Sequence, residues 1–276
     1  MKYYVIADPH AFYGITMKTL EDSGFFTDPS SCKLIVCGDL LDRGEDPDEM
    51  QRLMAGLLKQ DRLIYIRGNH EDLMDRLLVD LETGYGMDRI ACGESYHVHN
   101  GTWKTALQLS GMTHEEGIAR PDELIRRVKD SLFYRILLPT AVDYFETEHY
   151  VFTHGYIPCR ATVGNARYRN YNNFYFNADW RNASAEDWAY ARWYNGIELA
   201  CQRDLFLPDK TVVCGHWVCS YGHIYVDKKP REGDGSADYE PFYGKAREDE
   251  SGRTVLIALD ASTVESGILN CIVLED

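Results

Sequence analysis

The chain has 276 residues, of which 45% are hydrophobic, and a formal net charge of −15. This acidic balance argues against a duplex nucleic-acid partner, because phosphate neutralisation requires a basic face. No apolar run approaches the ~18 residues that span a bilayer, and no basic-then-apolar leader precedes the first predicted strand, so we expect a cytoplasmic protein without membrane contact. The eight cysteines include no Cys-x-x-Cys pair, which argues against a zinc ribbon.

The first 80 residues alternate strand-like and helix-like segments. Apolar runs over Lys2–Ala7, Lys33–Cys37 and Arg62–Ile66 predict three buried strands. Between and after them, apolar residues recur at helical spacing over Asp46–Lys59 and Glu71–Leu81. This β-α-β-α-β order predicts a largely parallel sheet with right-handed crossovers.

The remainder of the chain is less regular. We expect loops over residues 84–101 and over Lys228–Gly252, the second of which is the best candidate for disorder. Helices are predicted over Pro121–Leu132 and Ala185–Leu199, the latter capped by Ser184. Further strands are predicted over Ala141–Glu146, His149–Thr153, Thr211–Cys214, Ile224–Val226, Thr254–Leu259 and Ile268–Leu274. Because no repeat or linker is present, we expect one domain over 1–276 with cap-like insertions at about 84–135 and 156–200.

Polar segments directly follow the predicted strands. Residues 8–10 read Asp-Pro-His, residues 38–44 read Gly-Asp-Leu-Leu-Asp-Arg-Gly, and residues 67–71 read Arg-Gly-Asn-His-Glu. His154 and His216 follow later strand-like runs. Strand ends in an α/β fold converge on one edge, so these donors are expected to meet there. Carboxylate and amide oxygens suit hard cations, while imidazole suits Zn, Fe and Mn, and Asp39 is the natural bridge of a two-metal phosphoryl-transfer site.

These motifs, in this order, resemble those of the calcineurin-like metallophosphoesterases, and most closely the bacterial and phage serine/threonine phosphoprotein phosphatase branch. The resemblance implies a four-layer α/β/β/α sandwich of two mixed sheets flanked by helices. The stretch from Ala258 to Leu269 also resembles the closing strand pair of the bacterial members. Ala7 and Ala11 stand where the family usually has glycine, which implies a local backbone adjustment. Val218 stands where other branches have a second histidine, which favours the phosphatase-like branch over the DNA-repair nucleases.

The resemblance implies two divalent or trivalent ions, with Mn favoured and Fe, Zn or Ni as alternatives. One ion is expected to be held by Asp8, His10 and Asp39. The other is expected to be held by Asp39, Asn69, His154 and His216. A water bridging the two ions is then expected to attack phosphorus in line, without a covalent intermediate.

The resemblance also assigns the remaining roles in the site. His70, oriented by Asp42, is expected to protonate the leaving oxygen, and Arg43 to bind phosphate oxygens. Asn69 is expected to contact the substrate as well as a metal. Arg192 is the predicted second phosphate arginine, with Arg181 as the alternative. Arg67 is a candidate brace for the site, and His223 a weaker candidate as an extra ligand.

Three functions remain open at this point. The leading prediction is a metal-dependent phosphoesterase that acts on phosphate monoesters. More specifically, it is a serine/threonine protein phosphatase. The alternative is a dinucleoside polyphosphate hydrolase, which uses the same metals on a phosphoanhydride. A catalytically silent binding protein is the third, but intact ligands and an intact His70 argue against it. The substrate is therefore expected to be a phosphorylated protein or a small-molecule phosphate.

Overall fold

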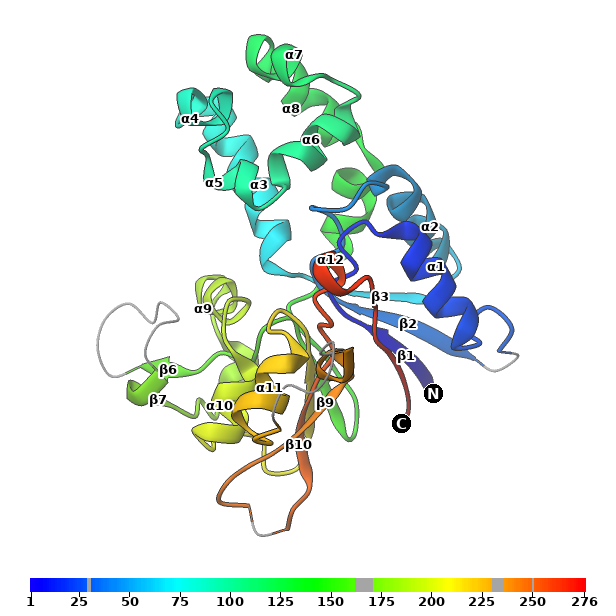
Figure 1. Ribbon diagram of the computed structural model, residues 1–276, viewed down its shortest axis with the longest axis vertical. Helices are drawn as coiled ribbons and strands as arrows, with labels where there is room; N and C mark the ends of the chain where they lie inside the picture. Colours follow the sequence, from blue (N-terminus) through cyan, green and yellow to red (C-terminus); the bar gives the residue numbers. More distant parts are fainter. Residues whose placement is uncertain (29–30, 162–170, 230–235, 250) are drawn as a thin grey trace.

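The computed structural model describes residues 1–28, 31–161, 171–229, 236–249 and 251–276. Two sheets lie at the centre, with helices α1 and α2 outside one and α9, α10 and α11 outside the other (Figure 1). The strands are β1 Lys2–Ile6, β2 Cys32–Cys37, β3 Leu63–Ile66, β4 Phe145–Glu146, β5 Tyr150–Phe152, β6 Arg160–Ala161, β7 Phe174–Tyr175, β8 Thr211–Cys214, β9 Phe242–Lys245, β10 Thr254–Ala258 and β11 Cys271–Glu275. The predicted four-layer α/β/β/α arrangement of two mixed sheets is confirmed.

The helices fall into three groups along the chain. The first group packs on the first sheet or leads away from it, and comprises α1 Tyr13–Asp22, α2 Pro47–Lys59 and α3 Asn69–Thr83. The second group comprises α4 Met87–Ala91, α5 Tyr96–His99, α6 Thr102–Ser110, α7 His114–Ala119 and α8 Pro121–Asp130. The third comprises α9 Ala185–Ala191, α10 Gly196–Gln202, α11 Cys219–Tyr225 and α12 Thr263–Ser266. None of the helices in the described ranges is long and apolar enough to cross a membrane.

The first sheet has the strand order β11-β1-β2-β3. Strands β1, β2 and β3 are parallel, and β11 pairs antiparallel with β1. The three strands predicted near the start of the chain are therefore confirmed to within one residue at each end, together with their parallel pairing. Their outer face packs against α1, α2 and α3 through residues such as Leu34, Val36 and Met54.

The second sheet has the order β4-β5-β8-β10-β9, in which β5, β8 and β10 are parallel. Strands β4 and β9 pair antiparallel at its two edges. Its inner face packs against the first sheet through alternate side chains, among them Val5, Ile35, Phe152, Val213 and Ile257. Because every second strand residue points to the same face, this interlayer is apolar and dry.

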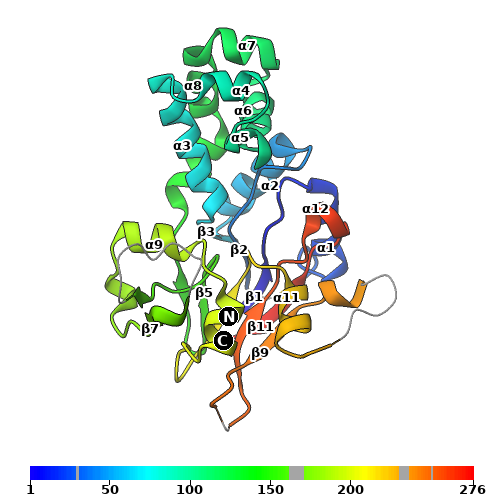
Figure 2. The same ribbon diagram turned by 60° about the vertical axis from the view of Figure 1, so that its left-hand side comes forward.

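Helices α4–α8, which we call the helical lobe (residues 87–130), project from the sheets at the end of α3, as Figures 1 and 2 show. The predicted helix over Pro121–Leu132 is confirmed as α8. The loop predicted over residues 84–101 is wrong, because α4 and α5 lie there. The Ser95 side chain caps α5 by accepting a hydrogen bond from the His97 N–H, a local contact that lets so short a helix form.

Two predictions in the second half of the chain are corrected. The single helix expected over Ala185–Leu199 is two helices, although Ser184 does cap the first one. The break comes where Asn195 caps α10 by accepting from the Glu198 N–H, so its side chain starts a new helix and interrupts the old one. The strand predicted over Ile224–Val226 is instead the end of α11 and the residue after it, because the buried side chains of α11 recur at helical spacing.

The C-terminal region differs in two further respects. The loop expected over Lys228–Gly252 contains β9 and a short 3₁₀-helix over Ser236–Tyr239, while residues 230–235 and 250 lie outside the described ranges. In β9 Phe242 is buried and Tyr243 exposed, a period-2 pattern that its charged flanks obscure. The segments that resemble a closing strand pair do not pair, because β10 lies in the second sheet and β11 in the first. That residues 1–276 form one domain with two cap-like insertions stays a prediction; residues 162–170 of the second insertion lie outside the described ranges.

Candidate metal centre

Two groups of ligand side chains meet at the carboxyl ends of the parallel strands, and Asp39 belongs to both. One group is His10, Asp39 and His70, and the other is Asp39, His154 and His216; within each, the ligand atoms lie within 4.8 Å of one another. Asp39 Oδ2 lies 3.8 Å from His10 Nε2, whereas Asp39 Oδ1 lies 3.3 Å from His154 Nε2. The two carboxylate oxygens therefore face different groups, as a bridging carboxylate must.

The other two predicted ligands, Asp8 and Asn69, adjoin these groups. Asn69 Oδ1 lies 2.7 Å from His154 Nε2. Asp8 Oδ2 accepts a hydrogen bond from the backbone N–H of His216 at 2.9 Å. The structure thus brings together six residues that lie up to 208 positions apart in the chain, and five of them are at most 3% exposed, with His216 half-buried.

Backbone carbonyls fix the orientation of the three ligand histidines. The Nδ1–H group of His10 donates to the Leu41 carbonyl at 3.0 Å, and that of His154 donates to the Cys37 carbonyl at 2.8 Å. His216 makes its own hydrogen bond with the backbone of Trp193. A histidine whose second nitrogen is held in this way presents a fixed lone pair, which is the usual outer arrangement around a metal-binding imidazole.

His70 has a different partner. Its Nδ1–H donates to the carboxylate Oδ2 of Asp42 at 2.7 Å, and its Nε2 lies 3.7 Å from Asp39 Oδ2. Burial lowers the pKa of His70, but the charges of Asp39 and Asp42 outweigh burial and leave its pKa raised. By contrast, burial lowers the pKa values of His10 and His216 to about 3. His10 and His216 are therefore neutral and able to bind a cation, whereas His70 is the histidine that most readily carries a proton.

Buried carboxylates give this edge a negative charge. Burial raises the pKa of Asp39, but the imidazoles around it, first that of His154, reverse this and hold its pKa below the usual range. Burial and then the charge of Asp260 raise the pKa of Asp8 well above its usual value, and burial raises the pKa of Asp260 to about 6. Carboxylates that raise one another's pKa are stabilised when cations bind between them. The donor set therefore fits a pair of hard or borderline cations.

The loops that carry the ligands have a strained backbone. Left-handed φ values occur at Asp8, His10, Ala11, Asp39, Asp42, Arg43 and His216. Asp and His tolerate this region better than most residues, and strain of this kind gathers at functional sites. Ala11, which replaces the glycine of the family pattern, keeps a φ of +56°, so the local adjustment expected there is a strained alanine and not a relaxed loop.

Glycines and Glu71 allow the loops to pack closely. A Cβ on Gly68 would lie 2.2 Å from Asp39 Oδ1, and one on Gly215 would lie 1.9 Å from Asp8 Oδ2. The Glu71 carboxylate accepts hydrogen bonds from the N–H groups of Gly68, Asp39 and Leu40 at 2.7, 3.0 and 3.0 Å. Glu71 therefore ties the loop after β3 to the loop after β2. Glu71 is the last residue of the motif at residues 67–71, and this role was not predicted for it.

Arg43 lies between the two imidazoles of the first group. Its Nη1 and Nη2 atoms donate to Nε2 of His10 and Nε2 of His70, both at 3.1 Å. The residue is otherwise exposed, so the guanidinium lies at the open side of the centre.

The other predicted arginines contact carboxylates outside the ligand groups. Arg192 is 6% exposed and pairs with Asp72 at 2.7 Å and with Asp143. Arg67 also pairs with Asp72, at 2.7 Å, and so holds the first turns of α3; that it braces the site stays a prediction. Arg181 pairs with Glu146. His223 lies 3.1 Å from the Glu240 carbonyl and does not belong to either ligand group.

Asp260 lies beside the ligand groups but was not predicted as a site residue. It follows β10 as the predicted ligands follow their own strands, and it is 7% exposed. The signal that identifies Asp8 and Asp39, a carboxylate directly after a buried strand, was present here as well. Asp260 was overlooked because it lies far along the chain from the other motifs.

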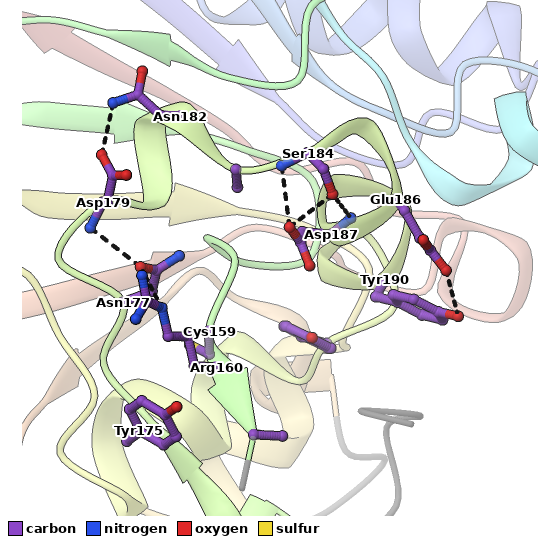
Figure 3. A pocket seen from close by; sticks show the side chains of 13 residues that line it. Cys159, Arg160, Tyr175, Asn177, Asp179, Asn182, Ser184, Glu186, Asp187 and Tyr190 are labelled. Carbon is purple, nitrogen blue, oxygen red and sulfur yellow. Dashed lines mark hydrogen bonds between the residues drawn. The ribbon is translucent and has the colours of Figure 1, made fainter. Parts of the chain in front are cut away.

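A polar cavity of about 590 Å³ lies between β6, β7 and the start of α9 (Figure 3). Three carboxylates, those of Asp179, Glu186 and Asp187, and one guanidinium, that of Arg160, are among its lining groups. Tyr194 lines this cavity, and the ring centroid of Trp193, the residue before it, lies 5.7 Å from the ring centroid of His216.

Comparison with known proteins places these observations in a family. The family model described as calcineurin-like phosphoesterase matches residues 1–216. The chain is 26% identical over 136 residues to an asymmetrical bis(5'-nucleosyl)-tetraphosphatase of Halalkalibacterium halodurans, covering 47% of this chain and 48% of that protein. It is 37% identical over 70 residues to serine/threonine-protein phosphatase 1 of Salmonella typhimurium, covering 25% of this chain and 30% of that protein. The chain therefore spans less than half the length of either relative in these matches.

Solved structures match over more of the chain at low identity. A cold-active protein-tyrosine phosphatase of a psychrophilic Shewanella is 15% identical with a TM-score of 0.46, covering 100% of this chain and 75% of that one. A protein serine/threonine phosphatase from Saccharomyces cerevisiae is 13% identical with a TM-score of 0.41, covering 79% of this chain and 61% of that one.

Proposed function

Because this chain belongs to the calcineurin-like phosphoesterase family, we propose that it is a metal-dependent phosphoesterase whose substrates are phosphoserine and phosphothreonine in proteins. The observation that carries the proposal is the pair of ligand groups that share Asp39, with His70 hydrogen-bonded to Asp42 beside them. Two cations joined by one carboxylate, with an acid within reach, are what hydrolysis of a phosphate ester requires.

In this proposal, Asp8, His10 and Asp39 hold one cation, and Asp39, Asn69, His154 and His216 hold the other. When bound, the two ions activate water and neutralise charge on the phosphoryl group. Mn is the proposed metal, with Fe, Zn or Ni as alternatives. The outer hydrogen bonds to the Leu41 and Cys37 carbonyls keep the imidazoles in place as ligands.

The remaining side chains act on the substrate. His70 transfers a proton from Nε2 to the leaving oxygen, and Asp42 stabilises the positive imidazole through Nδ1. Arg43 exchanges the two imidazoles to which it donates for phosphate oxygens, and Nε2 of His70, which accepts from Arg43 in the structure, is then free to take up the proton that it delivers. Asn69 lies beside this position at the start of α3. Nη1 and Nη2 of Arg192 pair with Asp72 and Asp143, so a phosphate contact by Arg192 would use its remaining N–H groups or displace one of these carboxylates.

The charge of the cavity beside α9 supports a peptide substrate. With three carboxylates and one guanidinium among its lining groups, it repels a polyphosphate chain and attracts basic or neutral side chains. The second candidate is hydrolysis of dinucleoside polyphosphates, which is favoured by the 136-residue match to a protein of that name. Both candidates use the same metals and the same His70.

A substrate panel separates the two candidates. The Mn²⁺-loaded protein is assayed on phosphoserine and phosphothreonine peptides with basic or acidic flanks, and on diadenosine tetraphosphate. We expect the highest kcat/KM on phosphopeptides with basic flanks. A clear preference for diadenosine tetraphosphate would replace the first candidate by the second, and failure to hydrolyse these substrates or any aryl phosphate would leave only a binding role.

A further inference from the structure

The Asp42 carboxylate has a second donor that comes from the helical lobe. Thr102, the first residue of α6, donates its Oγ1–H to Asp42 Oδ2 at 2.7 Å. This is the oxygen that also accepts from His70 Nδ1, again at 2.7 Å. Thr102 is fully buried and Asp42 is 2% exposed, so water does not compete for this oxygen.

The start of α6 is docked onto the loop that carries Asp42. Gly101 has a φ of +85°, and a Cβ there would lie 2.6 Å from the Arg43 backbone nitrogen, so only glycine permits this approach. One helical turn on, Lys104 pairs with Glu45 at 2.6 Å, and Gln108 donates to the Glu45 carbonyl at 3.2 Å. Gly101, Lys104 and Gln108 recur at a spacing of three to four, so this face, with Thr102 beside it at the start of α6, holds residues 42–45 in place.

We propose that Thr102 is a positioning residue that holds the Asp42 carboxylate in the orientation in which His70 acts as the general acid. The proposal rests on the function proposed above. The two donors fix both the rotation of the carboxylate and the oxygen that His70 uses. An Asp42 carboxylate held in this orientation keeps the Nδ1 proton of His70 in place and leaves Nε2 to deliver a proton to the leaving oxygen.

The helical lobe thereby acquires a role in catalysis. Thr102 lies 60 residues from Asp42 in the chain, and their contact spans the boundary between the lobe and the sheet that carries the ligands. A change in how the lobe packs would change the orientation of the acid without touching a metal ligand.

The test compares Thr102→Val with Thr102→Ser and with Thr105→Val. Thr105 is a matched control, because it is buried in the same helix and its hydroxyl donates to the Gly101 carbonyl of its own turn at 3.2 Å. Each variant, loaded with Mn²⁺, is assayed on phenyl phosphate, whose leaving group requires a proton, and on 2,4-dinitrophenyl phosphate, whose leaving group does not. Metal content is measured in parallel.

We expect Thr102→Val to lower kcat on phenyl phosphate by about tenfold, in the range for outer hydrogen bonds around a metal site. Its kcat on 2,4-dinitrophenyl phosphate, its KM values and its metal content stay near those of the wild type. Thr102→Ser restores the lost rate, and Thr105→Val changes neither substrate. An equal loss on both substrates, or no loss on either, would overturn the proposal.

A second measurement is independent of activity. Thermal unfolding is followed for Thr102→Val and Thr105→Val in the wild type and in an Asp42→Ala background. The contact predicts that Thr102→Val lowers Tm more than Thr105→Val does, and that this excess disappears when Asp42 is replaced. A wild type that hydrolyses no phosphate ester would reject the proposed function, while an unchanged excess in the Asp42→Ala background would reject the contact itself.

Discussion

Replacement of Asp39 by asparagine tests whether one carboxylate serves both ligand groups. Asparagine has nearly the same shape, tolerates the φ of +53° found at residue 39, and can still accept the hydrogen bond from the His70 backbone N–H at 3.0 Å. The substitution therefore removes a negative charge while leaving the loop intact. The Asp39 oxygens lie 3.3 to 3.8 Å from imidazoles of both groups, so the substitution removes a negative charge beside both proposed cation positions.

The size of the effect follows from Coulomb's law. Two unit charges about 4 Å apart interact by about 4 kcal/mol at an effective dielectric constant of about 20. The loss of one carboxylate charge beside each cation should therefore weaken binding by at least about 4 kcal/mol per ion, or roughly a thousandfold. We expect the wild type to retain two metal equivalents after desalting and Asp39→Asn to retain fewer than one.

The assay is elemental analysis of protein loaded with Mn²⁺ and desalted. Asp61→Asn is the matched control, because Asp61 also has a left-handed φ, of +55°, and its exposed carboxylate pairs with Lys33 instead of facing the centre. It removes the same charge and should retain two equivalents. If Asp39→Asn also retained two equivalents, with affinities within tenfold of the wild type, Asp39 would not be the shared ligand.

Four further predictions concern the acid, the loop packing, a glycine inside α2 and an ion pair. His70→Asn should lower kcat on phenyl phosphate by about 10²- to 10⁴-fold while keeping two metal equivalents, and a lost equivalent would show that His70 is instead a ligand. Gly68→Ala should destabilise the protein by about 1–3 kcal/mol in urea unfolding, because its Cβ would lie 2.2 Å from a carboxylate oxygen of the centre. Gly56→Ala, with nothing within 4 Å of the added Cβ inside α2, should stabilise it by about 0.5–1 kcal/mol. Arg181 holds the pKa of Glu146 at about 2, below the ordinary 4.5, so the stabilisation is present above about pH 4.5 and is lost as the pH falls toward 2. Glu146→Gln should therefore cost about 1 kcal/mol at pH 7 and nothing near pH 2, as measured by urea unfolding at both pH values.

Local patterns in the sequence were enough to predict which side chains meet in the candidate metal centre. Consecutive apolar residues predict a buried strand, and the polar residue that follows the strand must lie at the edge of the sheet. His10, Asp39 and His154 could each be placed by this rule, because the rule depends only on neighbours in the chain. The parallel pairing of the first three strands followed in the same way from the alternation of strands and helices at the start of the chain, whereas the four-layer arrangement of two mixed sheets followed from the family resemblance.

The contacts that hold the side chains around the centre could not be predicted from local patterns. Arg192 pairs with Asp72 across 120 residues, and Thr102 reaches Asp42 across 60. From the sequence, Arg192 could equally be exposed on a helix face, and Thr102 could simply begin a helix. Neither periodicity nor spacing predicts which distant residue each of them contacts in the folded protein. The sequence therefore determined which side chains gather at the strand ends, because chain direction and sheet periodicity are local. The tertiary structure alone decided how those side chains are held, because the holding groups come from elements that are distant in the chain and meet only when both sheets and the helical lobe have packed.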